Sequence, residues 1–204
     1  VYWTLDGSDG SIDRNDFVDD HGPGYDDHSD GVITRYAHGE FKRLPGVPSH
    51  MIIDPATDLL YIADAGNNAI KTLDINSGQT GGWLEVKEPG VTHYEILNAD
   101  VQTLVDGDEY DIIAPSGLSL IDGVLFVSDN GTGILHAFDL KGNHLDQYDT
   151  GLGAGALAGI YASSIDDLWV LDKTGNALFR LSSQDLSPLE VGNAGEFRGL
   201  HPSE

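Results

Sequence analysis

The stretch PSHMIIDPATDLLYIADAGNNAIKTLD, residues 48–74, decides the fold. It contains three short runs of β-forming residues, HMII, LLYIAD and AIKTLD, separated by the turn-forming clusters DPAT and AGNN. The second run ends at Asp64 and recurs as VLFVSD, ending at Asp129, and as DLWVLD, ending at Asp172. In each copy a third run, AIKTLD, GILHAFD or NALFRLS, ends ten residues after that Asp. Such a fixed offset indicates one supersecondary unit repeated along the chain.

The first run of each unit also aligns, as PSHMIID, PSGLSLI and LAGIYAS. His50 therefore stands where the later copies have Gly117 and Gly159. The aligned Asp residues are 65 and 43 residues apart. Because a four-stranded propeller blade has about 40 to 50 residues, the shorter spacing fits one blade. The longer spacing fits a blade with an insertion of 22 residues.

Residues 115–143, PSGLSLIDGVLFVSDNGTGILHAFDLKGN, resemble an NHL-type propeller blade, and VYWTLDG with GVITRYAHGEF resembles its YWTD and gluconolactonase-like relatives. The resemblance implies an all-β fold, a β-propeller of four-stranded blades that forms one domain over residues 1–204. About four blades are present. VYWTLD matches a second strand, GVITRY and GEFKRL are predicted as the third and fourth, and FRGLHP (197–202) resembles an opening strand. The chain is predicted either to close a ring by pairing its termini or to form part of a six-bladed propeller.

The composition is strongly acidic, with 34 Asp and Glu against 10 Lys and Arg, a net charge of −24, and 26 Asp among the acids. Such a surface repels phosphate groups, so neither nucleic acid nor an anionic membrane is expected as a partner. No membrane span, signal peptide or phosphate-binding loop is visible, and no nucleotide cofactor is expected. The absence of Cys excludes disulfides and thiol chemistry. We expect an extracellular or periplasmic location.

The first insertion, residues 7–30, holds eight Asp, two His and one base. Its segment DGSIDRND resembles the later half of an EF-hand loop, with Asp9, Asp13 and Asp16 as predicted ligands of Ca²⁺. The positions of the first two ligands would be Leu5 and Gly7, which offer no side-chain oxygen. A looser Ca²⁺ loop and a solvated acidic loop are therefore both open.

The second half of this insertion, HGPGYDDHSD, offers imidazole and carboxylate ligands for a borderline cation such as Zn²⁺. In a propeller, the loop between the second and third strands opens on the same face as the connection into the next blade. If residues 7–30 form such a loop, His50 points toward the central channel beneath it. The candidate ligands in this half are His21, Asp26, Asp27, His28 and Asp30. Of these, Asp26, His28 and Asp30 are predicted metal ligands, together with His50 at the channel.

The second insertion, about residues 82–111, contains VTHYEIL and DVQTLVDG, which are predicted to pair as an extended hairpin. The same topology places this hairpin on the His50 face, with His93 and Tyr94 near the site. The predicted binding residues are therefore His21, His28, His50, His93 and Tyr94. The repeated Asp64, Asp129 and Asp172 are predicted to be structural, because every unit has one, and His136 and His144 to be structural or solvated.

Two hypotheses about function are open. The first is a non-catalytic NHL-like propeller that binds a protein, a glycan or another small-molecule ligand on its loop-rich face, with Ca²⁺ as a candidate structural ion. The second is a metal-dependent hydrolase or lyase, as in gluconolactonase-like and amidating-lyase propellers, with a cation at the channel that polarises a carbonyl or activates water. The sequence departs from both enzyme patterns, because Ser116 replaces the Asn of the first and Ser49 separates Pro48 from His50 in the second. We favour the binding propeller.

Overall fold

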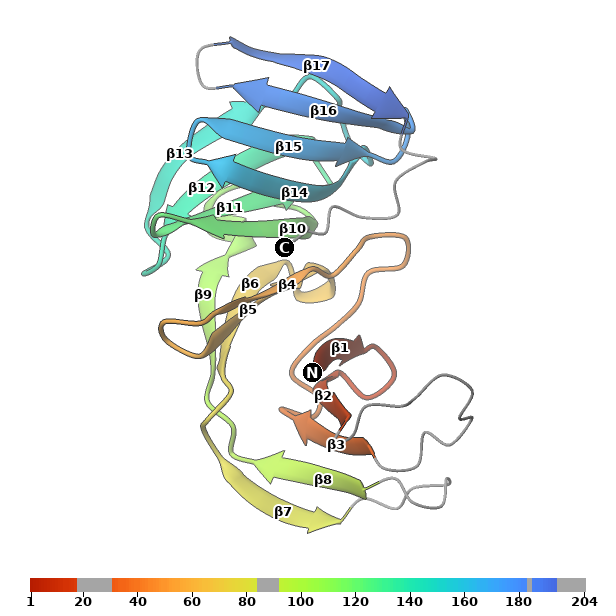
Figure 1. The fold of residues 1–204 in the computed structure, drawn as a ribbon, viewed down its shortest axis with the longest axis vertical. Coiled ribbons are helices and arrows are strands. Elements are labelled where there is room, and N and C mark those ends of the chain that lie inside the picture. Colours follow the sequence, from red (N-terminus) through yellow and green to blue (C-terminus); the bar gives the residue numbers. More distant parts are fainter. Residues whose placement is uncertain (18–30, 84–91, 183–184, 194–204) are drawn as a thin grey trace.

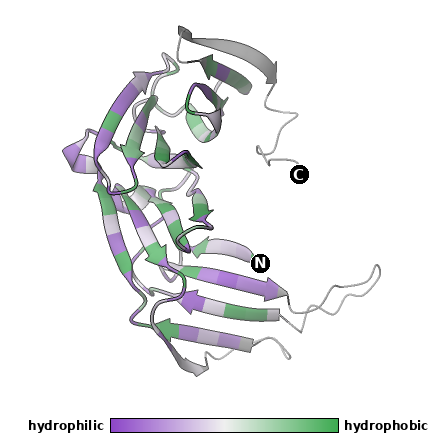
Figure 2. Ribbon diagram, turned by 60° about the vertical axis from the view of Figure 1, so that its left-hand side comes forward, coloured by the Kyte–Doolittle hydropathy of each residue, from purple (hydrophilic) through white to green (hydrophobic). Residues whose placement is uncertain are grey.

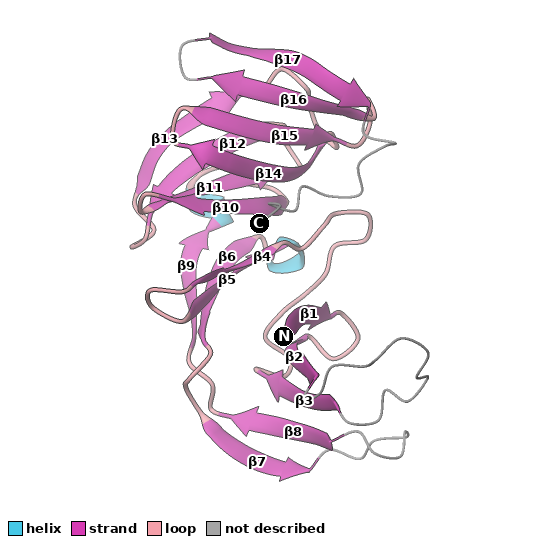
Figure 3. Ribbon diagram, in the orientation of Figure 1, coloured by secondary structure: helices cyan, strands magenta, loops and turns pink. Residues whose placement is uncertain are grey.

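The computed structural model describes residues 1–17, 31–83, 92–182 and 185–193. These residues form seventeen strands in four sheets, and the helix content is limited to two single-turn 3₁₀ helices, η1 (Ala65–Asn67) and η2 (Gly107–Glu109). Figure 3 shows strands connected by turns and loops throughout. The predicted all-β architecture is confirmed. The sheets follow one another along an arc, with the first and last sheets at its ends (Figure 1).

Three of the sheets are regular four-stranded blades in which consecutive strands pair antiparallel, as the repeat predicts. Each has its first strand at the inner edge and its fourth at the outer edge. Sheet B consists of β4 (Met51–Asp54), β5 (Leu59–Asp64), β6 (Ala69–Asp74) and β9 (Val101–Asp106); sheet C of β10 (Pro115–Ile121), β11 (Val124–Asp129), β12 (Ile134–Asp139) and β13 (His144–Asp149); and sheet D of β14 (Leu157–Ser164), β15 (Asp167–Asp172), β16 (Ala177–Ser182) and β17 (Asp185–Asn193).

The core lies between the sheets, because successive side chains of a strand point to opposite faces. In β11, Val127 packs toward sheet B with Tyr61 and Ile70, whereas Phe126 packs toward sheet D with Ile160. Figure 2 shows the resulting alternation of apolar and polar residues along the strands. The inner strands of sheets C and D lie so close together that a Cβ atom on Gly117 would come within 2.8 Å of the Cα atom of Gly159. The two glycines therefore permit the inner strands to pack.

Sheet A differs from the regular blades, and two sequence predictions about it were wrong. The third strand is β2, which starts at Ser11 inside the predicted insertion, and GVITRY is the fourth strand. GEFKRL (39–44) forms no strand and belongs to the connection to sheet B. The order is β1 (Tyr2–Asp6), β2 (Ser11–Phe17), β3 (Gly31–Tyr36), β8 (Thr92–Leu97) and β7 (Gln79–Trp83).

The second insertion also has a different topology from the predicted one. VTHYEIL and DVQTLVDG both form strands, but β8 pairs with β7 and joins sheet A, whereas β9 is the fourth strand of sheet B. The connection from β6 to β9 has 26 residues (75–100), the corresponding connection from β12 to β13 has four (140–143), and the difference equals the 22-residue insertion. The hairpin β7–β8 is thus inserted between two strands of sheet B and extends sheet A by pairing parallel to β3.

Sheet A lacks an inner first strand among the described residues, as the sequence predicts for this end of the chain. FRGLHP, which resembles such a strand, lies outside the described residues. The choice between a ring closed by the termini and part of a larger ring stays open for the same reason.

Candidate binding face

One edge of each sheet carries both the turn after the strand that ends in the repeated Asp and the connection into the next sheet, and we call this edge the loop face. The hydrogen bonds of Asp129 join the two kinds of segment. Its Oδ1 accepts the N–H groups of Ala114, in the connection, and Gly131, in the turn, at 2.7 and 2.9 Å. Its Oδ2 accepts the N–H of Ile113 at 3.0 Å and the hydroxyl of Thr132 at 2.7 Å. The carboxylate is fully buried and holds the loop face of sheet C together.

The other repeated carboxylates have related roles. Asp64 accepts the N–H of Lys42, in the connection from sheet A, at 2.8 Å and forms an ion pair of 2.9 Å with the ammonium group of Lys71. Asp172 accepts N–H groups of its own turn, from Thr174 at 2.8 Å and from the following residue at 2.9 Å. The predicted acceptance of backbone N–H groups by all three Asp side chains is confirmed.

The connection 37–50 lies across the loop face and is fixed to two sheets by backbone hydrogen bonds. The N–H of Phe41 donates to the carbonyl of Gly10, in the β1–β2 turn, at 3.0 Å. The N–H of Gly66, in the β5–β6 turn, donates to the carbonyl of Lys42 at 2.8 Å. Because both neighbouring turns bind its main chain, the position of this connection is set by the scaffold and not by its own side chains.

The same connection also reaches the last sheet. The ammonium group of Lys173, in the β15–β16 turn, donates to the carbonyl of Gly46 at 2.5 Å. Next to Gly46, the buried side chain of Val47 packs with Ala65 of sheet B and Ala114 of the connection to sheet C. Residues 41–47 therefore touch all four sheets or their connections and form the centre of the loop face.

The exposed side chains at this centre are basic and apolar. Lys42, Arg43 and Lys173 are exposed, and they account for three of the ten bases in a chain with a net charge of −24. Two large apolar side chains lie on the same face, Leu44 with 38% of its surface exposed and Ile113 with 59%. We call these five residues the basic ridge. This composition differs from the strongly acidic composition of the chain as a whole.

His50 immediately precedes β4 and binds the neighbouring sheet. Its Nδ1 accepts the N–H of Leu118 at 3.0 Å, and its own N–H donates to the carbonyl of Ser116 at 3.0 Å. A ring that accepts at Nδ1 is neutral and has its proton on Nε2. Desolvation of the ring by the surrounding protein lowers the pKa of His50. The residue as a whole is nevertheless exposed. Its hydrogen bonds give His50 a structural role between sheets B and C.

The predicted Ca²⁺ ligands occupy a turn and a strand. Asp9 lies in the β1–β2 turn and pairs with Nη1 of Arg35 at 2.6 Å, and Asp13 in β2 pairs with Nε of the same guanidinium at 3.3 Å. Asp16 instead pairs with Arg14 at 2.9 Å. Because Asp13 and Asp16 are an odd number of residues apart in one strand, their side chains point to opposite faces of sheet A. The structure therefore does not bring these three carboxylates together.

The remaining predicted ligands of the first insertion, His21, Asp26, His28 and Asp30, lie outside the described residues. The flanking strands show that residues 18–30 connect the third and fourth strands of sheet A, not the second and third. In antiparallel blades this connection leaves the sheet at the edge opposite the loop face. Among the residues that the structure describes, no group of three or more His, Asp or Glu side chains could hold a metal ion.

His93 and Tyr94 lie in β8, which pairs with β3 on the outer side of sheet A, whereas His50 precedes the innermost strand of sheet B. His93 is paired in register with Ile33 of β3. Desolvation, and to a smaller extent the charge of Arg35, lowers the pKa of His93. The structure thus places His93 and His50 on different sheets and at different distances from the inner edge.

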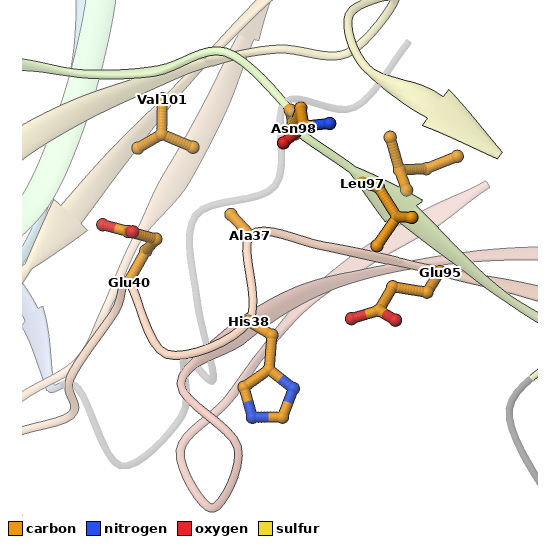
Figure 4. Close-up of a pocket in the computed structure, with 9 residues that line it drawn as sticks. Ala37, His38, Glu40, Glu95, Leu97, Asn98 and Val101 are labelled. Carbon is orange, nitrogen blue, oxygen red and sulfur yellow. The ribbon is translucent and has the colours of Figure 1, made fainter. Parts of the chain in front are cut away.

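A groove that the sequence did not indicate lies where the hairpin meets the start of the connection (Figure 4). It has a volume of about 350 Å³. Its polar side chains are His38, Glu40, Glu95 and Asn98, and Leu97 and Val101 contribute apolar surface (Figure 4). These residues belong to the connection, to β8, to β9 and to the loop between these two strands, so only the topology of the inserted hairpin brings them together.

No protein-family model matches this sequence, and no curated protein matches it significantly. Among solved structures, a chain in the crystal structure of the nidogen/laminin complex is similar, with a TM-score of 0.58 and 13% sequence identity. The alignment covers 91% of this chain and 59% of that chain. The fold is a β-propeller. A sequence identity of 13% shows similarity of fold alone. The present chain spans 59% of the length of the matched chain.

In the described part of the chain, no helix is long and apolar enough to cross a membrane.

Proposed function

We propose that this propeller is a non-catalytic binding protein and that it binds another protein through the basic ridge. The observation that supports this function is that the scaffold holds the main chain of the connection at residues 41–47 and leaves side chains there exposed. The main chain of residues 41–47 is held by turns of sheets A and B and by Lys173 of sheet D, while Lys42, Arg43 and Leu44 remain exposed. Loops fixed on a rigid scaffold are common positions for binding residues, because little conformational entropy is lost when a partner binds.

The chemistry of the ridge defines the partner. Basic side chains beside exposed apolar ones favour a protein surface with carboxylates around an apolar centre. Arg43 offers a planar donor for bidentate contact with a carboxylate, whereas Lys42 and Lys173 offer point charges. The acidity of the rest of the chain disfavours binding of the same partner elsewhere.

The test is affinity purification from the medium and lysate of the source organism. The bait chains are the wild type, a variant with Lys42→Glu, Arg43→Glu and Lys173→Glu, and a control with Lys141→Glu. Lys141 is also exposed but lies in the β12–β13 turn, at the opposite edge of its sheet. Lys173→Glu removes the hydrogen bond to Gly46, but the main-chain bonds of Phe41 and Lys42 to sheets A and B do not depend on the replaced side chains.

We expect one protein to be retained by the wild type and the Lys141→Glu control, with affinity for the triple variant lower by at least about tenfold, or 1.4 kcal/mol. Equal retention by the triple variant would refute the basic ridge as the binding site. Failure of the wild type to retain any protein would refute protein binding as the function.

A further inference from the structure

The groove where the inserted hairpin meets the connection has an apolar floor. Ala37, Ile96, Ala99 and Val101 line the groove, and all four pack against the core between sheets A and B. Leu97, which also lines it, is 46% exposed. The volume of about 350 Å³ lies in the range of small-molecule sites, about 300 to 1,000 Å³. Because its floor belongs to a packed core, the groove is preformed.

Two carboxylates line this groove at separate places. Figure 4 shows Glu40 and Glu95 on opposite sides of Ala37. Together with His38, they form no group that could hold a metal ion among the residues that the structure describes. A single small cation needs its ligands at about 2.0 to 2.6 Å, so these carboxylates do not suit one.

The scaffold fixes the main chain that carries both carboxylates. The N–H of Glu40 donates to the carbonyl of Ala37 at 3.2 Å, and the carbonyl of Glu40 accepts the amide of Asn67 at 3.1 Å and the ammonium group of Lys71. Glu95 lies within β8, in register with a residue of β3. The Glu40 residue is exposed and Glu95 is partly exposed. A ligand can therefore reach both side chains without a change in the backbone.

The charges of these carboxylates are not compensated within the described part of the chain, where neither side chain has a hydrogen bond or an ion pair. The two neighbouring bases bind other groups. Arg35, the register partner of Glu95, pairs with Asp9 and Asp13. Lys71, which binds the carbonyl of Glu40, pairs with the buried Asp64. The groove therefore presents two negative charges to a ligand.

We propose that this groove binds an aliphatic diamine or a longer polyamine. One ammonium group pairs with Glu40, another pairs with Glu95, and the methylene chain lies on the apolar floor. Two separated carboxylates favour a cation whose charges are also separated, and the apolar floor favours methylene groups over a hydrated inorganic ion. Neutral His38 and the amide oxygen of Asn98 offer further acceptors for ammonium N–H groups. This site is separate from the basic ridge and does not rest on the proposed function.

The test is a titration of the isotope-labelled full chain, followed by the NMR signals of the amide groups of Glu95, Asn98 and Val101. The probes are the α,ω-diamines from diaminopropane to diaminooctane and, for each length, the corresponding monoamine. All titrations are made at one ionic strength, because the whole chain is acidic and attracts cations without specificity.

The test variant combines Glu40→Gln with Glu95→Gln, and the control variant combines Asp122→Asn with Asp146→Asn. Asp122 lies in the β10–β11 turn, Asp146 lies in β13, and both are exposed. Each variant removes two negative charges, so diffuse attraction of cations changes equally in the two. Only the test variant changes the groove.

We expect one diamine length to bind best, at least about tenfold more tightly than the monoamine of that length, which corresponds to 1.4 kcal/mol. The Glu40→Gln, Glu95→Gln variant should lose at least about tenfold of this affinity, and the control should keep it. Equal affinities for diamine and monoamine would refute the proposal. Equal losses in the two variants would also refute it, because the attraction would then be diffuse.

Two competitors test other occupants of the groove. Displacement of the best diamine by Ca²⁺ at a lower concentration than that of the diamine would assign the groove to an inorganic cation. A lysine-containing tripeptide that binds more tightly than every diamine, and is equally sensitive to Glu40→Gln with Glu95→Gln, would assign it to a basic side chain of a protein. Either result overturns the assignment to a diamine.

Discussion

Strands β1 and β11 have the same place in the repeat and different surroundings. Both end in the repeated Asp and both contain aromatic and branched apolar residues. In β11 every residue after the first is buried, because sheet C has an inner strand and lies between sheets B and D. In β1 none is fully buried. The repeat thus determines the conformation of a strand locally, whereas its burial depends on which other segments join the sheet.

Sheets C and A also differ in how they obtain their outer strands. Sheet C obtains its fourth strand from the next residues in sequence, through a turn of four residues. Sheet A is extended by β8, which enters from a connection of sheet B and pairs parallel to β3. An insertion in one blade therefore stabilises its neighbour, and the two sheets should respond differently to mutation.

The largest expected effect comes from removing the repeated carboxylate in sheet C. Asp129→Ala leaves the buried N–H group of Ala114 and the partly buried N–H groups of Ile113 and Gly131 without their acceptor. We expect the free energy of unfolding to fall by about 3 kcal/mol or more, because each unsatisfied buried group costs about 1 to 3 kcal/mol. Urea denaturation measures this change.

The matched variant in sheet A is Asp6→Ala, which removes the bonds to Ser8 and a 3.8 Å ion pair with Arg35 at a partly exposed position. Its expected cost is about 1 kcal/mol, as for the loss of a capping side chain. Equal costs for Asp6→Ala and Asp129→Ala would show that the two sheets do not differ in this respect, although only sheet C has an inner strand among the described residues. An unchanged stability of Asp129→Ala together with loss of partner binding would contradict the structural role of this carboxylate.

An intermediate effect is expected when the hairpin is removed. Replacing residues 75–100 with the four residues 140–143 gives sheet B the short turn of sheet C. The change removes the partner of β3 and the packing of Ile96 on the core between sheets A and B. We expect unfolding to require about 1 to 2 kcal/mol less, the contribution of one large apolar side chain. Hydrogen exchange should accelerate in β3 and remain slow in β11 and β12.

The control for the hairpin variant is a chain in which only Ile96 is replaced by Ala. It retains the pairing of β8 with β3 and should leave exchange in β3 slow. Faster exchange across sheets B and C in the hairpin variant would show instead that the hairpin is required for the regular blades.

The sequence predicted those features that depend on local pattern. The strands of sheets C and D could be predicted from the alternation of apolar and polar residues, the turn residues and the position of the repeated Asp. Their pairing could be predicted as well, because each strand pairs with the strand next to it in sequence. The same rule would have found β2, because Asp16 lies ten residues after Asp6. The polar composition of SIDRNDF concealed this strand, since one face of sheet A is charged and the usual apolar alternation is weak.

Sheet membership could not be predicted from local pattern. VTHYEIL has the periodicity of a strand, but nothing in its residues specifies parallel pairing with β3. The groove lined by Glu40 and Glu95 follows from this pairing and was missed with it. The basic ridge was missed for a related reason, because Lys173 is 127 residues from Gly46 in sequence and meets it only in the fold.

The smallest expected effect concerns the pH dependence of stability, and it compares His136 of sheet C with His93 of sheet A. His136 is 1% exposed, its Nδ1 lies 3.4 Å from Nε2 of His144, and its Nε2 has no hydrogen-bond partner among the described residues. Burial, followed by the charge of His144, lowers the pKa of His136, although Asp129 and Asp111 oppose the shift. The folded protein therefore disfavours the imidazolium.

Since the pKa of His136 is lower in the folded than in the unfolded chain, the unfolded chain binds more protons between the two values. The free energy of unfolding should be constant above the unfolded value of about 6.5 and should fall as the pH decreases toward the folded pKa. Urea midpoints between pH 8 and pH 5 measure this loss, and His136→Phe should make it smaller. His93→Gln should have less influence, because His93 is only partly buried and its strand lies in the less enclosed sheet. The opposite result would be an unchanged pH profile of stability in His136→Phe and a flatter one in His93→Gln. It would show that the loss of stability in acid arises from His93 in sheet A and not from His136 in sheet C.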